Sequence, residues 1–287
     1  MALAILGACG GGGDDGGSGE GDAATVDGGG NTGDGGGSSG DGGGGNSDGG
    51  GGNGDGGGGD GGGGGSARIL FQCDAFNGGL CTMDADGENR QTVHASGFVP
   101  HGLAGGAILS HTSAYRVSRR SSSGTVADLG DGAFARPHPD GRILFQCAGL
   151  AGGICVMNAD GSNRVTIKAT GRVPDIDAGG RVVFHSDDYH VWRRDSGGGE
   201  TDLGLGAFAT WSSDGRIVFQ CTGLNGGLCR MNADGSNRET LLATGRVPHA
   251  ASDSSSTLVF HTDAYQITVR TASSNTPLGA GANAVWW

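Results

Sequence analysis

The sequence predicts an all-β repeat protein, and three observations lead to that prediction. A unit that opens at Arg68 opens again at Arg142 and Arg216, at a constant offset of 74 residues, and 18 of the 23 positions in 142–164 recur unchanged in 216–238. Each unit divides into two related halves of about 37 residues, in which short β-branched runs alternate with Gly or Asp-Gly turns. Helical periodicity of useful length is absent. A period near 40 with four short strands is typical of a propeller blade, so we expect six four-stranded blades.

The ends of the repeat region predict how the ring closes. The region starts with a strand at Arg68 and lacks the strand that precedes this one in the other units. The missing strand is supplied at the C-terminus, because 284–287 aligns with 209–212. A ring whose last strand completes its first blade leaves no open sheet edge. The expected blades are 282–287 with 68–94, then 96–128, 132–168, 171–203, 206–242 and 245–278.

Two stretches carry a family resemblance. The run Trp-Ser-Ser-Asp-Gly-Arg-Ile-Val-Phe at 211–219 and the run Met-Asn-Ala-Asp-Gly-Ser-Asn-Arg at 231–238 resemble the TolB-type propeller repeat, a relative of WD repeats. The resemblance covers 66–287 and is degenerate in the even blades, where Asp187 and Asp263 keep only part of the pattern. It implies a six-bladed propeller and little about activity, because function depends on the individual site. The segment before residue 66 does not resemble TolB's own first domain, so none of that protein's partner contacts are carried over.

The first nine residues resemble the end of a bacterial lipoprotein signal peptide. Leu6, Gly7 and Ala8 form a lipobox before Cys9, which would carry the acyl chain. The usual basic region is missing, and we expect it upstream of Met1. The alternative is an unmodified N-terminus with a chance cysteine. Acylation would supply the membrane attachment, since no other segment is apolar enough to cross a bilayer.

Residues 10–65 are predicted to form a disordered Gly/Asp-rich tether. They contain nine Asp, one Glu and no Lys or Arg, and Asp recurs every seven residues from Asp27 to Asp55. No apolar residue between Val26 and Ala67 offsets the entropy of ordering the chain. A calcium-binding β-roll also uses Gly and Asp but needs an apolar residue in each repeat, which is absent here.

Six further cysteines form three pairs at identical spacing. Each pair flanks a Gly-rich loop between two strands, where facing residues of a hairpin come within disulfide range. A metal site would need closer ligand spacing or a nearby His, and a catalytic nucleophile would not come in three copies. We predict three hairpin disulfides and an oxidising compartment. The pairs are Cys73–Cys81, Cys147–Cys155 and Cys221–Cys229.

Glutamine and histidine alternate at one position of the second strand of the blades. The residues are Gln72, His111, Gln146, His185, Gln220 and His261. A ring of this kind could gather a metal, but side chains on this strand point into the neighbouring blade. We therefore expect interblade hydrogen bonds, because buried polar groups need partners.

The innermost strands carry the candidate binding site. Two of their positions differ in chemistry from blade to blade although the surrounding repeats are nearly copies. The first holds His101, Arg136, Asp175, Thr210, His249 and Val285, and the second holds Leu103, His138, Asp177, Ser212, Ala251 and Trp287. We expect a pocket at the channel mouth beside the disulfide-braced loops. The sequence shows no recognisable Ser-His-Asp catalytic triad, and no metal site or cofactor is predicted.

Charge and motifs together give the expected function. Ten of the 30 acidic residues lie in 10–65, so the propeller is near neutral, and it has no basic stripe for nucleic acid. We expect an exported, monomeric lipoprotein of the bacterial cell envelope, anchored in the outer membrane or at the cell surface. Its propeller would bind a protein, a cell-wall component or a glycan. The alternative is an envelope or extracellular enzyme, such as a polysaccharide lyase. Some propeller polysaccharide lyases bind a metal through His and Gln side chains in this region. In this alternative the channel histidines would be the functional residues.

Overall fold

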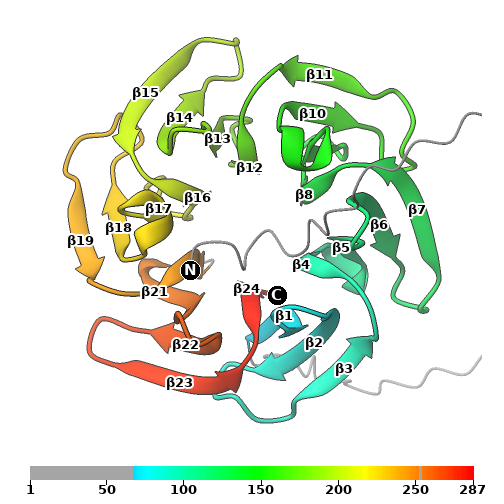
Figure 1. Ribbon diagram of the computed structural model, residues 1–287, viewed down its shortest axis with the longest axis horizontal. Helices are drawn as coiled ribbons and strands as arrows, with labels where there is room; N and C mark the ends of the chain where they lie inside the picture. Colours follow the sequence, from blue (N-terminus) through cyan, green and yellow to red (C-terminus); the bar gives the residue numbers. More distant parts are fainter. Residues whose placement is uncertain (1–66, 252–253) are drawn as a thin grey trace, which may run out of the picture. The chain divides into compact units, whose positions relative to one another are not determined.

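In the part of the chain that the structure describes, twenty-four strands form six sheets of four antiparallel strands, and the sheets are arranged as blades around a central channel (Figure 1). The computed structural model describes residues 67–251 and 254–287. The predicted signal-peptide end at 1–9 and the tether at 10–65 lie outside the described residues. Within the described ranges no helix is long and apolar enough to cross a membrane. Three short 3₁₀ turns complete the elements: η1 (Ala104–Gly106), η2 (Gly149–Ala151) and η3 (Gly223–Asn225).

The strands of each blade follow the chain from the channel outward, except in blade 1. Blade 1 contains β24 (Ala282–Trp286), β1 (Arg68–Asp74), β2 (Gly78–Asp84) and β3 (Gln91–His94). Blade 2 contains β4 (Phe98–Gly102), β5 (Ile108–His111), β6 (Arg116–Arg120) and β7 (Val126–Asp131). Blade 3 contains β8 (Ala133–Pro137), β9 (Ile143–Gln146), β10 (Ile154–Met157) and β11 (Val165–Lys168).

The other three blades repeat this order. Blade 4 contains β12 (Arg172–Ile176), β13 (Val182–His185), β14 (His190–Arg194) and β15 (Glu200–Leu205). Blade 5 contains β16 (Ala207–Trp211), β17 (Ile217–Gln220), β18 (Leu228–Met231) and β19 (Glu239–Leu242). Blade 6 contains β20 (Arg246–Ala251), β21 (Ser254–His261), β22 (Gln266–Arg270) and β23 (Asn275–Ala280). The outer strands of the even blades end two or three residues beyond the predicted limits.

The predicted closure of the ring is confirmed. The C-terminal strand β24 pairs antiparallel with β1, with Ile69 opposite Trp286 and Leu70 opposite Val285. Figure 1 shows β24 as the innermost strand of the blade that holds β1, β2 and β3. The two ends of the described chain therefore share one sheet, and β1 has no open edge.

A left-handed residue near the start of each innermost strand links the blades. Its φ lies between 46° and 51°, an uncommon conformation for residues other than glycine. In blade 4 this residue is Val173, whose amide N–H donates to Gln146 Oε1 of blade 3 at 2.9 Å. His185 Nδ1 accepts the equivalent bond from Phe208 at 3.4 Å. The six left-handed residues are Val99, Phe134, Val173, Phe208, Val247 and Asn283.

These bonds confirm that the Gln and His ring joins blades. All three glutamines and two of the three histidines accept the amide of the next blade. His111 Nδ1 is the exception and lacks a hydrogen-bond partner among the described atoms. In addition, each of the three histidines stacks on a tyrosine of its own blade, as His261 does on Tyr265 with 5.6 Å between ring centres. The ring therefore stabilises the blade interfaces.

A second interblade contact comes from the last arginine of each odd-blade motif. The guanidinium of Arg164 lies 4.5 Å from the ring centre of Phe145 and donates to Leu129 O of the preceding blade at 2.8 Å. Arg90 and Arg238 repeat the arrangement over the equivalent phenylalanines. Because these phenylalanines are fully buried between blades, the arginine closes the outer end of the core.

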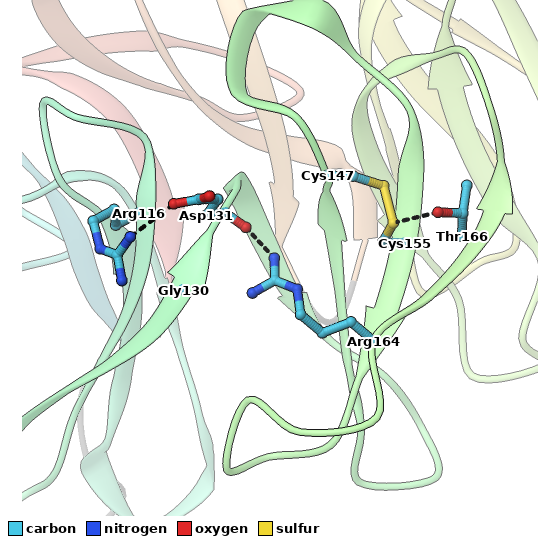
Figure 2. A pocket seen from close by; sticks show the side chains of 7 residues that line it. All are labelled: Arg116, Gly130, Asp131, Cys147, Cys155, Arg164 and Thr166. Carbon is cyan, nitrogen blue, oxygen red and sulfur yellow. Dashed lines mark hydrogen bonds and ion pairs between the residues drawn. A yellow bond between two sulfur atoms is a disulfide. The ribbon is translucent and has the colours of Figure 1, made fainter.

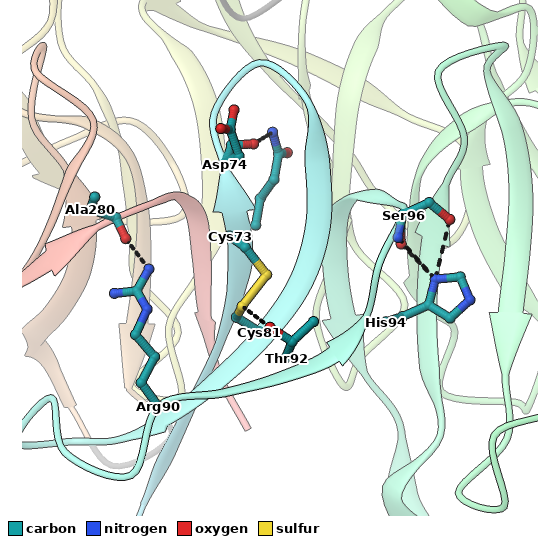
Figure 3. Close-up of a disulfide and its surroundings, with 9 residues drawn as sticks. Cys73, Asp74, Cys81, Arg90, Thr92, His94, Ser96 and Ala280 are labelled. Atoms are coloured by element: carbon teal, nitrogen blue, oxygen red, sulfur yellow. Dashed lines mark hydrogen bonds between the residues drawn. A yellow bond between two sulfur atoms is a disulfide. The ribbon is translucent and has the colours of Figure 1, made fainter.

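All three predicted disulfides are present. Cys73 bonds to Cys81, Cys147 to Cys155 and Cys221 to Cys229, with Cα–Cα distances of 5.3, 5.4 and 5.2 Å. In Figure 3 the first disulfide closes the neck of the β1–β2 hairpin, and Cys81 also contacts Thr92 of β3. Disulfides of this kind indicate an oxidising compartment outside the cytoplasm.

Candidate functional site

Six side chains, one from each blade, meet midway along the channel. They stand at the middle of the innermost strands, two residues after the left-handed position, and are His101, Arg136, Asp175, Thr210, His249 and Val285. The structure thus brings together the first candidate set that the sequence identified. Arg136, Asp175, Thr210 and Val285 are buried there, whereas His101 and His249 keep part of their surface exposed.

An ion pair fixes one side of this ring. Arg136 Nε lies 3.3 Å from Asp175 Oδ1, and both residues are buried. The second carboxylate oxygen of Asp175 accepts the backbone N–H of Trp211 at 2.8 Å. Burial raises the pKa of Asp175, and the attraction of Arg136 opposes that rise. Both oxygens are engaged, so the carboxylate holds neighbouring blades in register.

The two channel histidines face each other across blade 1. The rings of His101 and His249 are 5.9 Å apart between centres. Burial and, after it, the charge of Arg136 together lower the pKa of His249 to about 3. The same causes, with His249 added, hold the pKa of His101 well below its ordinary value. Both rings are therefore neutral at physiological pH.

Apolar side chains pack beside this ring. Toward the end with the disulfide loops, Val99, Phe134, Val173 and Phe208 form an apolar cluster around the axis, and Val247 packs against it. A cavity bordered by Val99, Val173, Phe208 and Val247 of this cluster, and by Arg136 and His249, has a volume of about 10 Å³. A space of that size holds about one water molecule.

The second candidate set lies at the end of the innermost strands, and its expected place is corrected. Ala133, at the start of β8, pairs with Gln146 beside the Cys147–Cys155 loop, whereas Pro137 pairs with Ile143 at the other end. His138 follows Pro137, so it lies at the mouth opposite the disulfide loops. The same holds for Leu103, Asp177, Ser212, Ala251 and Trp287, because the six blades share one strand order. The direction of each innermost strand relative to the disulfide loop fixes this position.

Most polar members of this set close a turn. Asp177 accepts the backbone N–H of Arg181 at 2.8 Å and pairs with its guanidinium at 2.6 Å. His138 Nδ1 lies 2.6 Å from Asp140, and Ser212 Oγ donates to Arg216 O at 3.1 Å. These side chains are satisfied within their own hairpins. Trp287 differs, because it is 36% exposed.

Trp287 borders a cleft that the sequence analysis missed. The cleft opens between blades 6 and 1, at the mouth opposite the disulfide loops, and has a volume of about 480 Å³. We call it the Trp cleft. Its lining residues are Ala67, Ala85, Ala251, Thr257, Val269, Thr271, Trp286 and Trp287. All eight are uncharged.

A second cavity of about 520 Å³ lies near the outer end of the interface between blades 2 and 3. Figure 2 shows its charged side chains in a row, with Arg116 beside Asp131 and Arg164 reaching the backbone of the same segment. Arg116 lies 2.7 Å from both Asp128 and Asp131. The charges of this cavity are thus already paired within the protein.

Among the described residues, no group of three or more His, Cys, Asp or Glu side chains is arranged to hold a metal ion.

Comparison with known proteins shows the fold. No family model matches the chain, and no curated protein matches it in sequence. A chain in the crystal structure of a nidogen/laminin complex is 14% identical, with 77% of this chain and 98% of that chain covered and a TM-score of 0.60. AztD from Citrobacter koseri is 10% identical, with coverage of 77% and 98% and a TM-score of 0.50. Streptogramin B lyase is 14% identical, with coverage of 75% and 74% and a TM-score of 0.50.

At these identities the likeness concerns the fold alone. The chain shares a propeller architecture with proteins of different activities, so the fold does not select one of them. The resemblance to the TolB-type repeat stays a prediction.

Proposed function

We propose that the protein is an exported lipoprotein whose propeller is a binding module for a ligand of the bacterial cell envelope. The ligand is a protein, a cell-wall polymer or a glycan. The module is a monomer, held at the outer membrane or the cell surface by an acyl chain on Cys9, and it faces the periplasm or the medium. One observation carries the choice of binding over catalysis: the charged residues that converge in the channel, Arg136 and Asp175, are buried and paired with each other.

The chemistry of the channel supports this choice. A general acid or base must come within hydrogen-bond reach of its substrate and should titrate near the working pH. His249 has a pKa of about 3, and the adjoining cavity admits about one water. Asp175 is held by Arg136 and by a backbone amide. These groups stabilise the ring from within, and they leave the outer surfaces of the propeller for a ligand.

The anchor is tested by replacing Cys9 with serine. We expect the wild-type protein to carry acyl mass and to sediment with membranes, and the Cys9→Ser protein to stay in the soluble fraction. Wild-type protein without an acyl group that partitions as the variant does would contradict the anchor. This result would leave the binding role of the propeller untouched, because the two parts of the proposal are measured separately.

Binding and turnover are compared on one set of polymers. Full-length Cys9→Ser protein is mixed with isolated cell walls, envelope proteins and polysaccharides, and both retention and new chain ends are measured. We expect retention on at least one polymer or protein without product. Product formation that disappears in a His101→Ala, His249→Ala variant would establish the lyase-like alternative instead.

A further inference from the structure

The Trp cleft has an internal counterpart, because the interface between blades 4 and 5 is built from the same positions. Trp211 pairs with Ile217 as Trp286 pairs with Ile69, so the two tryptophans are equivalent. The register of β13 with β14 and of β21 with β22 aligns Arg193 with Val269. The same alignment matches Arg181 and Asp195 with Thr257 and Thr271. The innermost strands match Asp177 with Ala251, and the turn that follows is two residues longer in blade 6.

Charged side chains fill the counterpart. The guanidinium of Arg181 lies 4.4 Å from the ring centre of Trp211, and Asp177 holds it at 2.6 Å. Arg193 donates to Ala233 O at 2.7 Å and pairs with Asp195 at 2.9 Å. Trp211 is 8% exposed as a result.

In the Trp cleft all four charged residues are replaced by small uncharged ones. Alanine, threonine and valine take their places. One guanidinium lies at the rim, that of Arg68, which is 6.0 Å from the ring centre of Trp287 and 3.6 Å from Asp84. The opening of about 480 Å³ lies within the range of about 300–1,000 Å³ that is usual for small-ligand sites. The guanidinium of Arg181 covers Trp211 in blade 5, and the equivalent position over Trp286 is open to a ligand.

The lining determines the chemistry of that ligand. A charged group would lose water in the cleft and would meet no unpaired opposite charge among the described lining residues, because Arg68 at the rim is already paired with Asp84. The ligand is therefore neutral. It needs an apolar face for the indole rings and polar groups for the hydroxyls of Thr257 and Thr271.

A sugar ring has this combination of an apolar face and a hydroxyl-bearing edge. We propose that the Trp cleft binds a neutral oligosaccharide, with one sugar ring over Trp286 and Trp287 at the rim. This inference rests on the proposed function and names the ligand class of the binding module.

The test uses the internal counterpart to close the cleft. The double substitution Ala251→Asp, Thr257→Arg introduces the pair that covers Trp211. The matched control is Asp177→Ala, Arg181→Thr, which removes the same pair from blade 4. The probes are cellohexaose, maltohexaose and chitohexaose, with hexagalacturonate as the charged comparison, and calorimetry on full-length Cys9→Ser protein measures affinity.

We expect at least one neutral probe to bind the parent protein more tightly than hexagalacturonate does. The closing substitutions should weaken that binding about tenfold or more, and the blade 4 control should leave it within about twofold. If the closing variant does not fold, Trp287→Ala, at an exposed position, should give the same loss.

The inference is overturned if no neutral probe binds, if hexagalacturonate binds best, or if the variants at the cleft bind as the parent does. If the protein still binds cell walls or envelope proteins in the retention assay, the ligand class is wrong and the binding function stands. If the protein binds none of the materials in that assay, the proposed function fails together with this inference.

Discussion

The three interblade histidines should make this propeller sensitive to acid. Burial lowers the pKa of His111, His185 and His261 to about 4, from 6.5 in an unfolded chain. His185 and His261 accept an amide N–H at Nδ1, so a proton there would break the bond to the next blade. The odd blades use glutamine at the same position, which makes the same bond and does not titrate. We therefore choose the triple substitution of these histidines by glutamine.

The size of the effect follows from linkage. Between about pH 6.5 and pH 4 the unfolded histidine binds a proton that the folded one does not, so stability falls as the pH falls. For a shift from 6.5 to about 4, each histidine removes about 2 kcal/mol of stability between pH 7.5 and pH 5. The triple variant should lose about 6 kcal/mol less than the wild type over this interval. The triple variant keeps the dependence of stability on pH that comes from His101 and His249, because the pKa values of these two residues stay low.

Urea unfolding, followed by tryptophan fluorescence at a series of pH values, measures this difference. At pH 7.5 the variant should be the less stable protein, since each lost ring contact with tyrosine costs about 0.5–1.5 kcal/mol. The two stability curves should then approach or cross as the pH falls. His94→Gln, on the outer strand β3, controls for removing a histidine outside the blade interfaces. Parallel curves for the wild type and the triple variant would refute the assignment of neutral, buried histidines.

Three further predictions concern the ring and its loops. Deleting 282–287 removes the buried Ala282, Ala284 and Val285 and uncovers the edge of β1, so the chain should unfold or aggregate, and an unchanged melting temperature would contradict the closure. Asp175→Asn leaves Arg136 buried without an opposite charge and should cost about 3–5 kcal/mol in chemical unfolding, whereas a loss below about 1 kcal/mol would mean that the pair is solvated. Replacing Cys147 and Cys155 together by alanine should lower stability by about 2–3 kcal/mol, and peptide mapping of the parent should find only the three local disulfides.

The repeat made the fold predictable, because near-copies of one unit must bury the same faces. Gln72, Gln146 and Gln220 illustrate this: their recurrence on the second strand predicted a buried polar contact between blades, and each makes the same bond. The closing strand was predictable for the same reason, since 284–287 repeats a strand that blade 1 otherwise lacks. The N-terminal predictions concern residues outside the described ranges.

The site was harder to predict because it depends on which end of a strand a residue occupies and on what the next blade supplies. Arg136 and His138 are two residues apart, yet the first is sealed in the channel and the second closes a turn at the mouth. The Trp cleft combines Thr257 and Val269 of blade 6 with Trp286 of blade 1, and sequence alone does not give that apposition. The signal was present in the repeat itself, as the loss in blade 6 of the charges at 181, 193 and 195 of blade 4.

The indole N–H resonances test the central claim, that ligands bind at the Trp cleft. The chain has four tryptophans, so its ¹⁵N spectrum should show four indole signals. Adding the neutral hexasaccharides in turn should shift the signals of Trp286 and Trp287 with at least one of them, and should leave Trp192 and Trp211 in place. Four unmoved signals with every sugar, or a shift confined to Trp192 or Trp211, would contradict the account.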